Sequence, residues 1–212
     1  MGFIINPFRF VPAGETWEMP YDNTTGWTLP SNPTITGGSM VYTSTLTNPV
    51  TAHFEVPFVL SDTLWYCDYD IASMGGNAVD QYHIWHCGFA AGTASMPNNT
   101  QDSIAAATVM NNSNFQFELF GRDGGTDYSA QSGVNTAYGA FYPRLARTSA
   151  TGNLFQGFTN SERTSGGTEL TDTIPSTIDT LTHLHHDTAA FNSSQNLSMN
   201  IPNLVLYNGM SP

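Results

Sequence analysis

Short stretches in which apolar and polar residues alternate follow one another along the chain, with turn residues between them. In TAHFEVPFV (51–59) every second residue from Ala52 to Phe58 is apolar, which leaves His53 and Glu55 on the opposite face. FQFEL (115–119) alternates in the same way, with Glu118 on its polar face. This period of two predicts strands that bury one face and expose the other.

The same reading extended along the chain predicts an all-β protein, because only the short window 102–110 has any helical character. Turn signals such as Gly75-Gly76-Asn77 and Gly124-Gly125 separate the runs. The pattern is typical of an antiparallel β-sandwich or jelly roll with one domain at 21–212. Strands are expected near 3–5, 27–29, 40–45, 51–59, 64–72, 82–90, 104–110, 115–120, 137–146, 153–160, 178–186 and 197–207.

Residues 1–20 form an N-terminal arm or first strand with an apolar beginning, FIINPFRF. One interpretation is a strand that completes a sheet beside the last strand. The other is a docking segment on a neighbouring subunit, since exposed apolar surface indicates a partner. The docking candidates are Phe3, Ile5, Phe8 and Phe10.

Charge narrows the function classes. The chain has 17 acidic residues against five arginines, no lysine, and a net charge of −12. Nucleic-acid binding and attraction to an anionic membrane are therefore not expected. No apolar run approaches the roughly 18 residues of a membrane span, so no membrane insertion is expected, and the start does not resemble a signal peptide. A protein made in the host cytoplasm that works outside the cell, on a virion surface, fits these observations.

Five segments in this order resemble concanavalin A-like, laminin G-like jelly-roll domains. They are DNTTGWTLPSNPTITGGSMVYTS (22–44), HFEVPFVLSDTLWYCDYDIAS (53–73), FQFELFGRDGG (115–125), AYGAFYPRLARTSATGNLFQGFTNSERTSGG (137–167) and NLSMNIPNLVLYNG (196–209). The opening FIINPFRF is similar to the N-termini of structural proteins of tailed bacteriophages, many of which carry such domains.

This resemblance implies a non-enzymatic virion structural protein of a tailed bacteriophage. The role would be capsid decoration, cement or tail-fibre-type adhesion, with other virion proteins as partners, homo-oligomer formation and binding of host-surface glycans. A free carbohydrate-binding lectin is the alternative. A glycan hydrolase is less favoured, because the family's Glu-x-Asp-x-x-Glu pattern is missing and Asp68-Tyr69-Asp70 is its nearest counterpart.

Aromatic residues that could stack on sugar rings are Trp27, Tyr66, Tyr69 and Trp85. No cofactor is expected apart from calcium, which the resemblance allows at Asp123 and Asp127; an ordinary Asp-Gly turn is the alternative there.

Histidines and cysteines leave further alternatives open. His183, His185 and His186 are either half of a transition-metal site or hydrogen-bonding surface residues, and on a regular strand His86 and Cys87 face opposite ways. A hairpin turning at 74–77 would place Cys67 opposite Cys87, as a disulfide or as two buried thiols.

Overall fold

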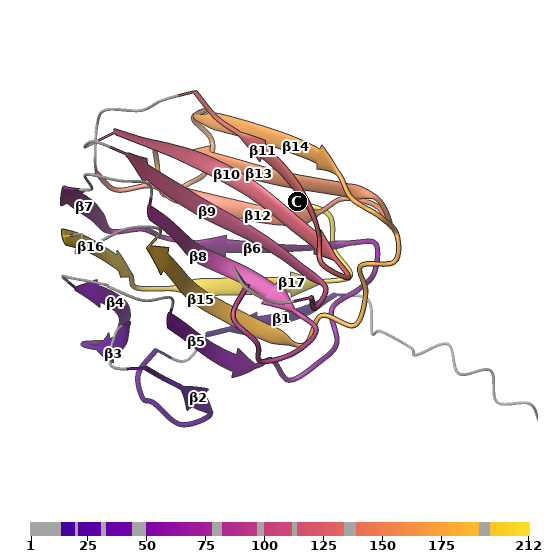
Figure 1. Cartoon of the computed structure of the whole chain (residues 1–212), viewed down its shortest axis with the longest axis horizontal. Helices are drawn as coiled ribbons and strands as arrows, with labels where there is room; N and C mark the ends of the chain where they lie inside the picture. Colours follow the sequence, from indigo (N-terminus) through magenta and orange to yellow (C-terminus); the bar gives the residue numbers. More distant parts are fainter. Residues whose placement is uncertain are drawn as a thin grey trace, which may run out of the picture.

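Apart from a 3₁₀ turn at Met96, the regular structure in the described residues consists of antiparallel strands, which confirms the predicted all-β fold class (Figure 1). The computed structural model describes residues 14–19, 21–30, 33–43, 50–77, 82–96, 100–111, 114–133, 139–190 and 196–212. Within these ranges no helix is long and apolar enough to cross a membrane. The expected strand at 3–5 and the docking candidates Phe3, Ile5, Phe8 and Phe10 lie outside the described residues.

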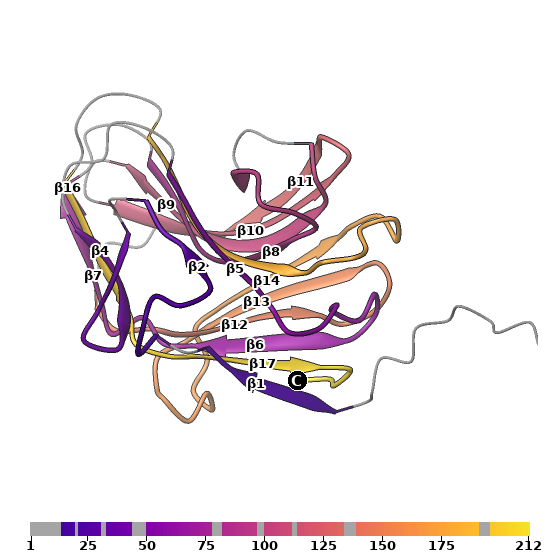
Figure 2. The same cartoon turned by 90° about the horizontal axis from the view of Figure 1, so that it is seen from below.

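Two large sheets face each other, and a smaller sheet lies across one end (Figure 2). The first large sheet has the order β1 (Glu15–Glu18), β17 (Leu204–Asn208), β6 (Trp65–Tyr69), β12 (Tyr142–Arg147), β13 (Gly152–Phe158) and β14 (Thr168–Thr173). The second has the order β11 (Thr126–Gln131), β10 (Asn114–Asp123), β9 (Ser103–Asn111), β8 (Tyr82–Ala90), β15 (His183–Ala190), β5 (Val50–Glu55) and β2 (Trp27–Thr28). The small sheet has the order β3 (Thr34–Thr36), β4 (Ser39–Thr43), β16 (Asn196–Ile201) and β7 (Ser73–Asn77).

The main core lies between the two large sheets and follows the predicted alternation. In β6 the side chains of Trp65, Cys67 and Tyr69 are fully buried, while the two residues between them are half-buried. Phe115 and Phe117 of β10 enter the same core from the opposite sheet. Each sheet therefore turns one face inward, as expected for a sandwich.

A β-bulge in β8 interrupts this alternation. Trp85 pairs with Ala107 of β9 and Cys87 with Ala106, so His86 is one extra residue in β8. The extra residue turns both His86 and Cys87 toward the core, where they are fully buried. The prediction that these two side chains face opposite ways is wrong because it assumed a regular strand.

The two cysteines meet across the core rather than within a hairpin. Cys67 lies in β6 of one large sheet and Cys87 in β8 of the other, with 3.8 Å between their sulfur atoms. Both are free thiols, and burial raises the pKa of Cys67 well above its ordinary value. Such a thiol is inert, because the reactive thiolate is disfavoured. The residues expected to form the turn, 74–77, belong to β7 of the small sheet instead.

Other strand boundaries in the structure differ from those predicted from the sequence. The single strand expected at 197–207 is two strands, because Pro202 separates β16 from β17 and the two belong to different sheets. β1 pairs with β17, so the first described strand lies beside the last one. The window 102–110 is not helical, because all of it after residue 102 lies in β9, the strand next to β8.

Two buried histidines, His86 and His186, form hydrogen bonds inside the core. Tyr69 is hydrogen-bonded to Nδ1 of His86 over 2.7 Å. The Tyr21 hydroxyl lies 2.7 Å from Nε2 of His186, whose Nδ1 donates to the His86 carbonyl over 2.9 Å. Burial lowers the pKa of each histidine to about 3, so both rings are neutral at neutral pH.

Residues 91–96, which we call the strap, follow β8 and fold back over the outer face of its sheet. The buried carboxylate of Asp187 accepts the Met96 amide over 2.7 Å, and Arg122 donates to the Met96 carbonyl over 2.7 Å. His185 Nε2 donates to the Gly92 carbonyl over 2.8 Å. Gly88 lies directly beneath, where a Cβ atom would come 2.2 Å from Cε of Met96. Both backbone polar groups of Met96, the last residue of the strap, are thus bonded to buried side chains.

Removing the Asp187 carboxylate should loosen the strap. Asp187→Ala leaves the buried Met96 amide without its acceptor, which costs roughly 1–3 kcal/mol of the free energy of unfolding. Hydrogen exchange should show lost protection at Met96, and urea denaturation should show the lower stability. The control is Asp179→Ala at an exposed position, which should change neither. Unchanged exchange at Met96 in Asp187→Ala would contradict the anchoring.

Mild acid should destabilise the protein through its buried histidines. The unfolded chain binds protons below its ordinary histidine pKa, whereas folded His86 and His186 stay neutral down to about 3. Stability should therefore fall between about pH 7 and pH 5.5, by about 1 kcal/mol for each of the two. His86→Leu should show a smaller loss, while Tyr69→Phe, which keeps the histidine, should show the full loss. Equal pH dependence of urea denaturation in His86→Leu and wild type would refute this.

Candidate functional site

The outer face of the seven-stranded sheet carries a second cluster of buried residues beyond the main core. Trp85 of β8 and Phe120 of β10 belong to it, together with Met96 of the strap. Strand alternation places them there, because Ile84 and Leu119 next to them in sequence point into the main core. The register brings together one row of residues across this face: Thr51, Asp187, Trp85, Ala107, Glu118 and Gln131.

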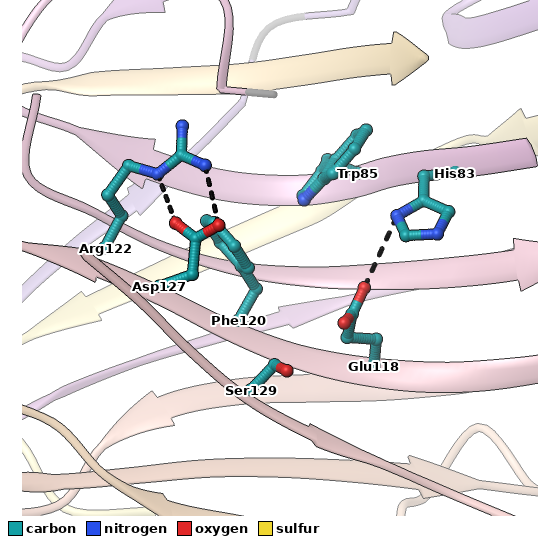
Figure 3. A pocket seen from close by; sticks show the side chains of 7 residues that line it. All are labelled: His83, Trp85, Glu118, Phe120, Arg122, Asp127 and Ser129. Atoms are coloured by element: carbon teal, nitrogen blue, oxygen red, sulfur yellow. Dashed lines mark hydrogen bonds and ion pairs between the residues drawn. The ribbon is translucent and has the colours of Figure 1, made fainter. Parts of the chain in front are cut away.

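A cavity of about 260 Å³ opens beside this cluster. Figure 3 shows side chains from β8, β10 and β11 converging around it. The lining residues are His83, Trp85, Glu118, Phe120, Arg122, Asp127 and Ser129. Two aromatic rings, two carboxylates, one guanidinium, one imidazole and one hydroxyl therefore share a single small space.

Arg122 and Asp127 form a bidentate ion pair at one side of the cavity. Nε of Arg122 lies 2.5 Å from Oδ1 of Asp127, and the second guanidinium nitrogen lies 3.0 Å from Oδ2 (Figure 3). The guanidinium carbon is 5.3 Å from the centre of the Phe120 ring, within cation–π distance. Only 9% of the Arg122 side chain is exposed, against 53% for Asp127. The arginine is thus fixed in place, with its charge paired.

The Glu118 carboxylate occupies the other side. It accepts a hydrogen bond from Gln131 over 3.1 Å, and Nδ1 of His83 lies 3.6 Å from its second oxygen. Burial raises the pKa of Glu118, although hydrogen bonds from Gln131 and Ser129 oppose that rise. Burial also lowers the pKa of His83 to about 4, so at neutral pH a neutral imidazole faces the carboxylate.

Trp85 supplies a wall of the cavity and an unpartnered polar group. Its side chain is almost fully buried at 3% residue exposure, and its ring lies 5.2 Å from that of His83. Among the described residues the indole nitrogen has no hydrogen-bond partner. Figure 3 shows this nitrogen on the side of the ring toward Phe120. The indole N–H is therefore a donor at the cavity wall that no described group uses.

The other aromatic candidates lie elsewhere. Trp27 is half-buried in β2 and stacks on His186 at 5.5 Å. Tyr66 lies on the outer face of the six-stranded sheet, stacked on Tyr207 at 4.3 Å. Tyr69 is fully buried and bonded to His86, so its ring faces the core rather than a surface. Of the four, only Trp85 lines the cavity.

The calcium candidates do not converge. Across the β10–β11 hairpin, Asp127 pairs with Arg122 and Asp123 with Thr126, so the two carboxylates lie on opposite faces. Asp123 accepts a hydrogen bond from Thr177, and Asp127 is bound to Arg122. The expected shared cation site is therefore not formed by this pair.

The histidine candidates are divided between the two faces of β15. His183 and His185 share the outer face, where His53 of β5 joins them with its ring 5.6 Å from His185. His186 points inward to Tyr21. Within the described residues, no group of three or more His, Cys, Asp or Glu is arranged to hold a metal ion.

Sequence reasoning missed most of the cavity lining. Alternation correctly assigned Glu118 to the polar face of its strand, but it did not indicate that Arg122 and Asp127 would lie on that same face with it. The available signal was an aromatic residue, Phe120, on an otherwise polar face. An apolar ring at such a position indicates a buried surface on that side of the sheet.

No family model and no curated protein matches the chain. Among solved structures, the CBM2 module of Lactobacillus casei BL23 phage J-1 evolved Dit is similar at a TM-score of 0.62 and 10% identity, covering 94% of this chain and 99% of that one. The legume lectin-like domain from Entamoeba histolytica has a TM-score of 0.59 at 8% identity, covering 86% and 90%. An alginate lyase from Pseudomonas aeruginosa has a TM-score of 0.56 at 9% identity, covering 85% and 87%. These likenesses show the fold, which is a concanavalin A-like, legume lectin-like β-sandwich.

Proposed function

We propose that the cavity on the outer face of the seven-stranded sheet binds carbohydrate. The observation that carries this proposal is the convergence of Trp85 and Phe120 with buried polar side chains in one small space. A sugar ring presents C–H groups that pack on aromatic rings and hydroxyls that bond to carboxylates and guanidinium groups. Ligand pockets of this kind combine apolar walls with a few placed polar groups.

The similar structures support a binding role. One of them is described as a legume lectin-like domain and another as a CBM2 module, and both share the sandwich of this chain. An alginate lyase shares it as well, so the fold alone does not separate binding from catalysis. The choice depends on the residues of the cavity.

Binding without catalysis is favoured by the placement of the carboxylates. Hydrolysis of a glycosidic bond requires two carboxyl groups about 5–9 Å apart, one of them free to act as a nucleophile or base. Glu118 pairs with Gln131 of β11, and Gln131 is four residues from Asp127 on that strand. The backbone positions of the two acids are therefore about 13 Å apart along the strand direction. The Asp127 carboxylate is moreover bound on both oxygens by Arg122.

The setting we propose is the virion surface of a tailed bacteriophage, as capsid decoration or as a tail-fibre-type adhesion module that meets host-surface glycans. The phage origin of one similar structure supports this, as do the lysine-free composition and the apolar start of the chain. Synthesis in the host cytoplasm, assembly with other virion proteins and homo-oligomer formation belong to the same proposal. A free lectin is the alternative, and it would use the same cavity.

Filling the cavity should abolish glycan binding. Ser129 is exposed at the cavity wall, so Ser129→Phe places a ring in the space without removing a core side chain. A ligand found on a glycan array should bind this variant at least about tenfold more weakly by calorimetry, because its apolar contacts and hydrogen bonds are both blocked.

Two variants on the other large sheet serve as controls. Thr171→Phe introduces the same ring at an exposed position of β14 and should bind normally. Tyr66→Ala removes the stacked tyrosine of β6 and should also bind normally. If Tyr66→Ala loses binding while Ser129→Phe keeps it, the glycan site lies on the six-stranded sheet and the proposed cavity is wrong.

The virion setting has its own test. Deleting residues 1–12 should release the protein from phage particles, because the apolar segment would no longer dock on a neighbouring subunit. Circular dichroism and thermal melting should remain unchanged, since the described strands begin at Glu15. Full retention of the truncated protein on particles would refute docking by this segment, and failure of the intact chain to join particles would favour the free lectin.

A further inference from the structure

Glu118 is a buried carboxylate, and its partners in the part of the chain that the structure describes carry no positive charge. Its residue exposure is 5%, and its hydrogen bonds come from the Gln131 amide and the Ser129 hydroxyl. His83 stands 3.6 Å away and is neutral above a pKa of about 4. Buried carboxylates are normally paired with a cation, since leaving water costs more than neutral hydrogen bonds return. Among the described residues, no arginine forms an ion pair with Glu118.

Arg122 is the one cationic side chain among the described residues that line the cavity, and it is already engaged. Arg122 is four residues from Glu118 on the same face of β10, yet it is bound to Asp127 on two atoms and donates to the Met96 carbonyl. The chain contains no lysine. The cavity therefore has two carboxylates and one guanidinium, and its unbalanced negative charge is on Glu118.

The walls of the cavity are suited to a positive group. Trp85 and Phe120 lie in it with their aromatic rings, whose faces attract cations. The unpartnered indole N–H of Trp85 is a donor for an oxygen acceptor beside such a group. An ammonium group next to sugar oxygens would meet a carboxylate, aromatic rings and a free donor at once.

We propose that the cavity prefers an amino sugar with a free, protonated amine, which completes the ion pair of Glu118. This inference rests on the proposed carbohydrate binding and names the class of sugar. Uronic acids are disfavoured by the same charge, since their carboxylate would face Glu118 and Asp127. Neutral sugars would fill the space but leave Glu118 unpaired.

The test compares trisaccharides that share a β-1,4-linked backbone and differ at one substituent. The glucosamine trimer carries an amine, the N-acetylglucosamine trimer an amide and cellotriose a hydroxyl, while a uronate trimer supplies the anionic case. Calorimetry at about pH 6 and about 0.15 M salt keeps the amine protonated and screens distant charges. The glucosamine trimer should bind at least about tenfold more tightly than the other three, because its hydrogen bond is charge-assisted.

A protein with a net charge of −12 attracts cations in general. Matched variants separate this general attraction from the specific effect of the Glu118 carboxylate. Glu118→Gln and Glu169→Gln each remove one negative charge. Glu169 is exposed on β14 of the other large sheet, where it accepts from Gln156 over 2.9 Å. The preference for the amine should disappear in Glu118→Gln and persist in Glu169→Gln, with folding of both checked by circular dichroism.

The outcomes distinguish this inference from the proposed function. If any of the other three trimers binds wild type as tightly as the glucosamine trimer, the preference for an amine is wrong while carbohydrate binding stands. An amine preference that persists in Glu118→Gln overturns the role of Glu118 in the same way. If no saccharide in this series or on the array binds wild type, the proposed function fails and this inference fails with it.

Discussion

One inserted residue in β8 is the constraint on which both faces of the seven-stranded sheet depend. Because His86 is extra relative to β9, the strand can turn His86 and Cys87 inward while Trp85 remains outside. The carbonyl of the bulged residue accepts the His186 side chain, and its ring is bonded to Tyr69 of the opposite sheet. The Tyr69 contact therefore links the two large sheets through buried polar groups, while the His186 contact links β15 to β8 within one sheet.

The chain has only five positively charged residues against 17 acidic ones, and the way the arginines are paired determines the charge of the cavity. Arg144 binds Asp68 on two atoms, and Arg163 pairs with Asp70. Arg147 donates to backbone carbonyls of Ile178 and Ala150 instead of to an acid. Together with Arg122, these are all the cations in the described residues, and each has its partners. Within the ranges that the structure describes, no further arginine is available to pair with Glu118.

The sequence predicted the faces of single strands better than the way strands combine. Period-two alternation placed Phe115 and Glu118 on the correct sides of β10, because burial of one face acts on each strand separately. It could not show the bulge at His86, which depends on pairing with β9, nor that 74–77 forms a strand. The cavity was missed for the same reason, since its residues meet only when β8, β10 and β11 are in register. Two lining residues were candidates from the sequence, Trp85 as an aromatic ring able to stack on a sugar and Asp127 as a calcium ligand, although Asp127 pairs with Arg122 instead.

A buried carboxylate without a cation destabilises the folded protein, and a site that binds a cationic ligand needs such a group. If Glu118 were paired within the chain, as Asp127 is with Arg122, the cavity would be more stable and would have nothing left to offer a ligand. The two carboxylates of one cavity thus illustrate two uses of the same chemical group. Asp127 fixes the arginine that anchors the strap through the Met96 carbonyl, whereas Glu118 has neutral hydrogen-bond partners, which is why we propose that it meets a cationic ligand. Similar sandwiches occur in a lectin-like domain and in a lyase, so the chemistry of this cavity depends on its few side chains rather than on the fold.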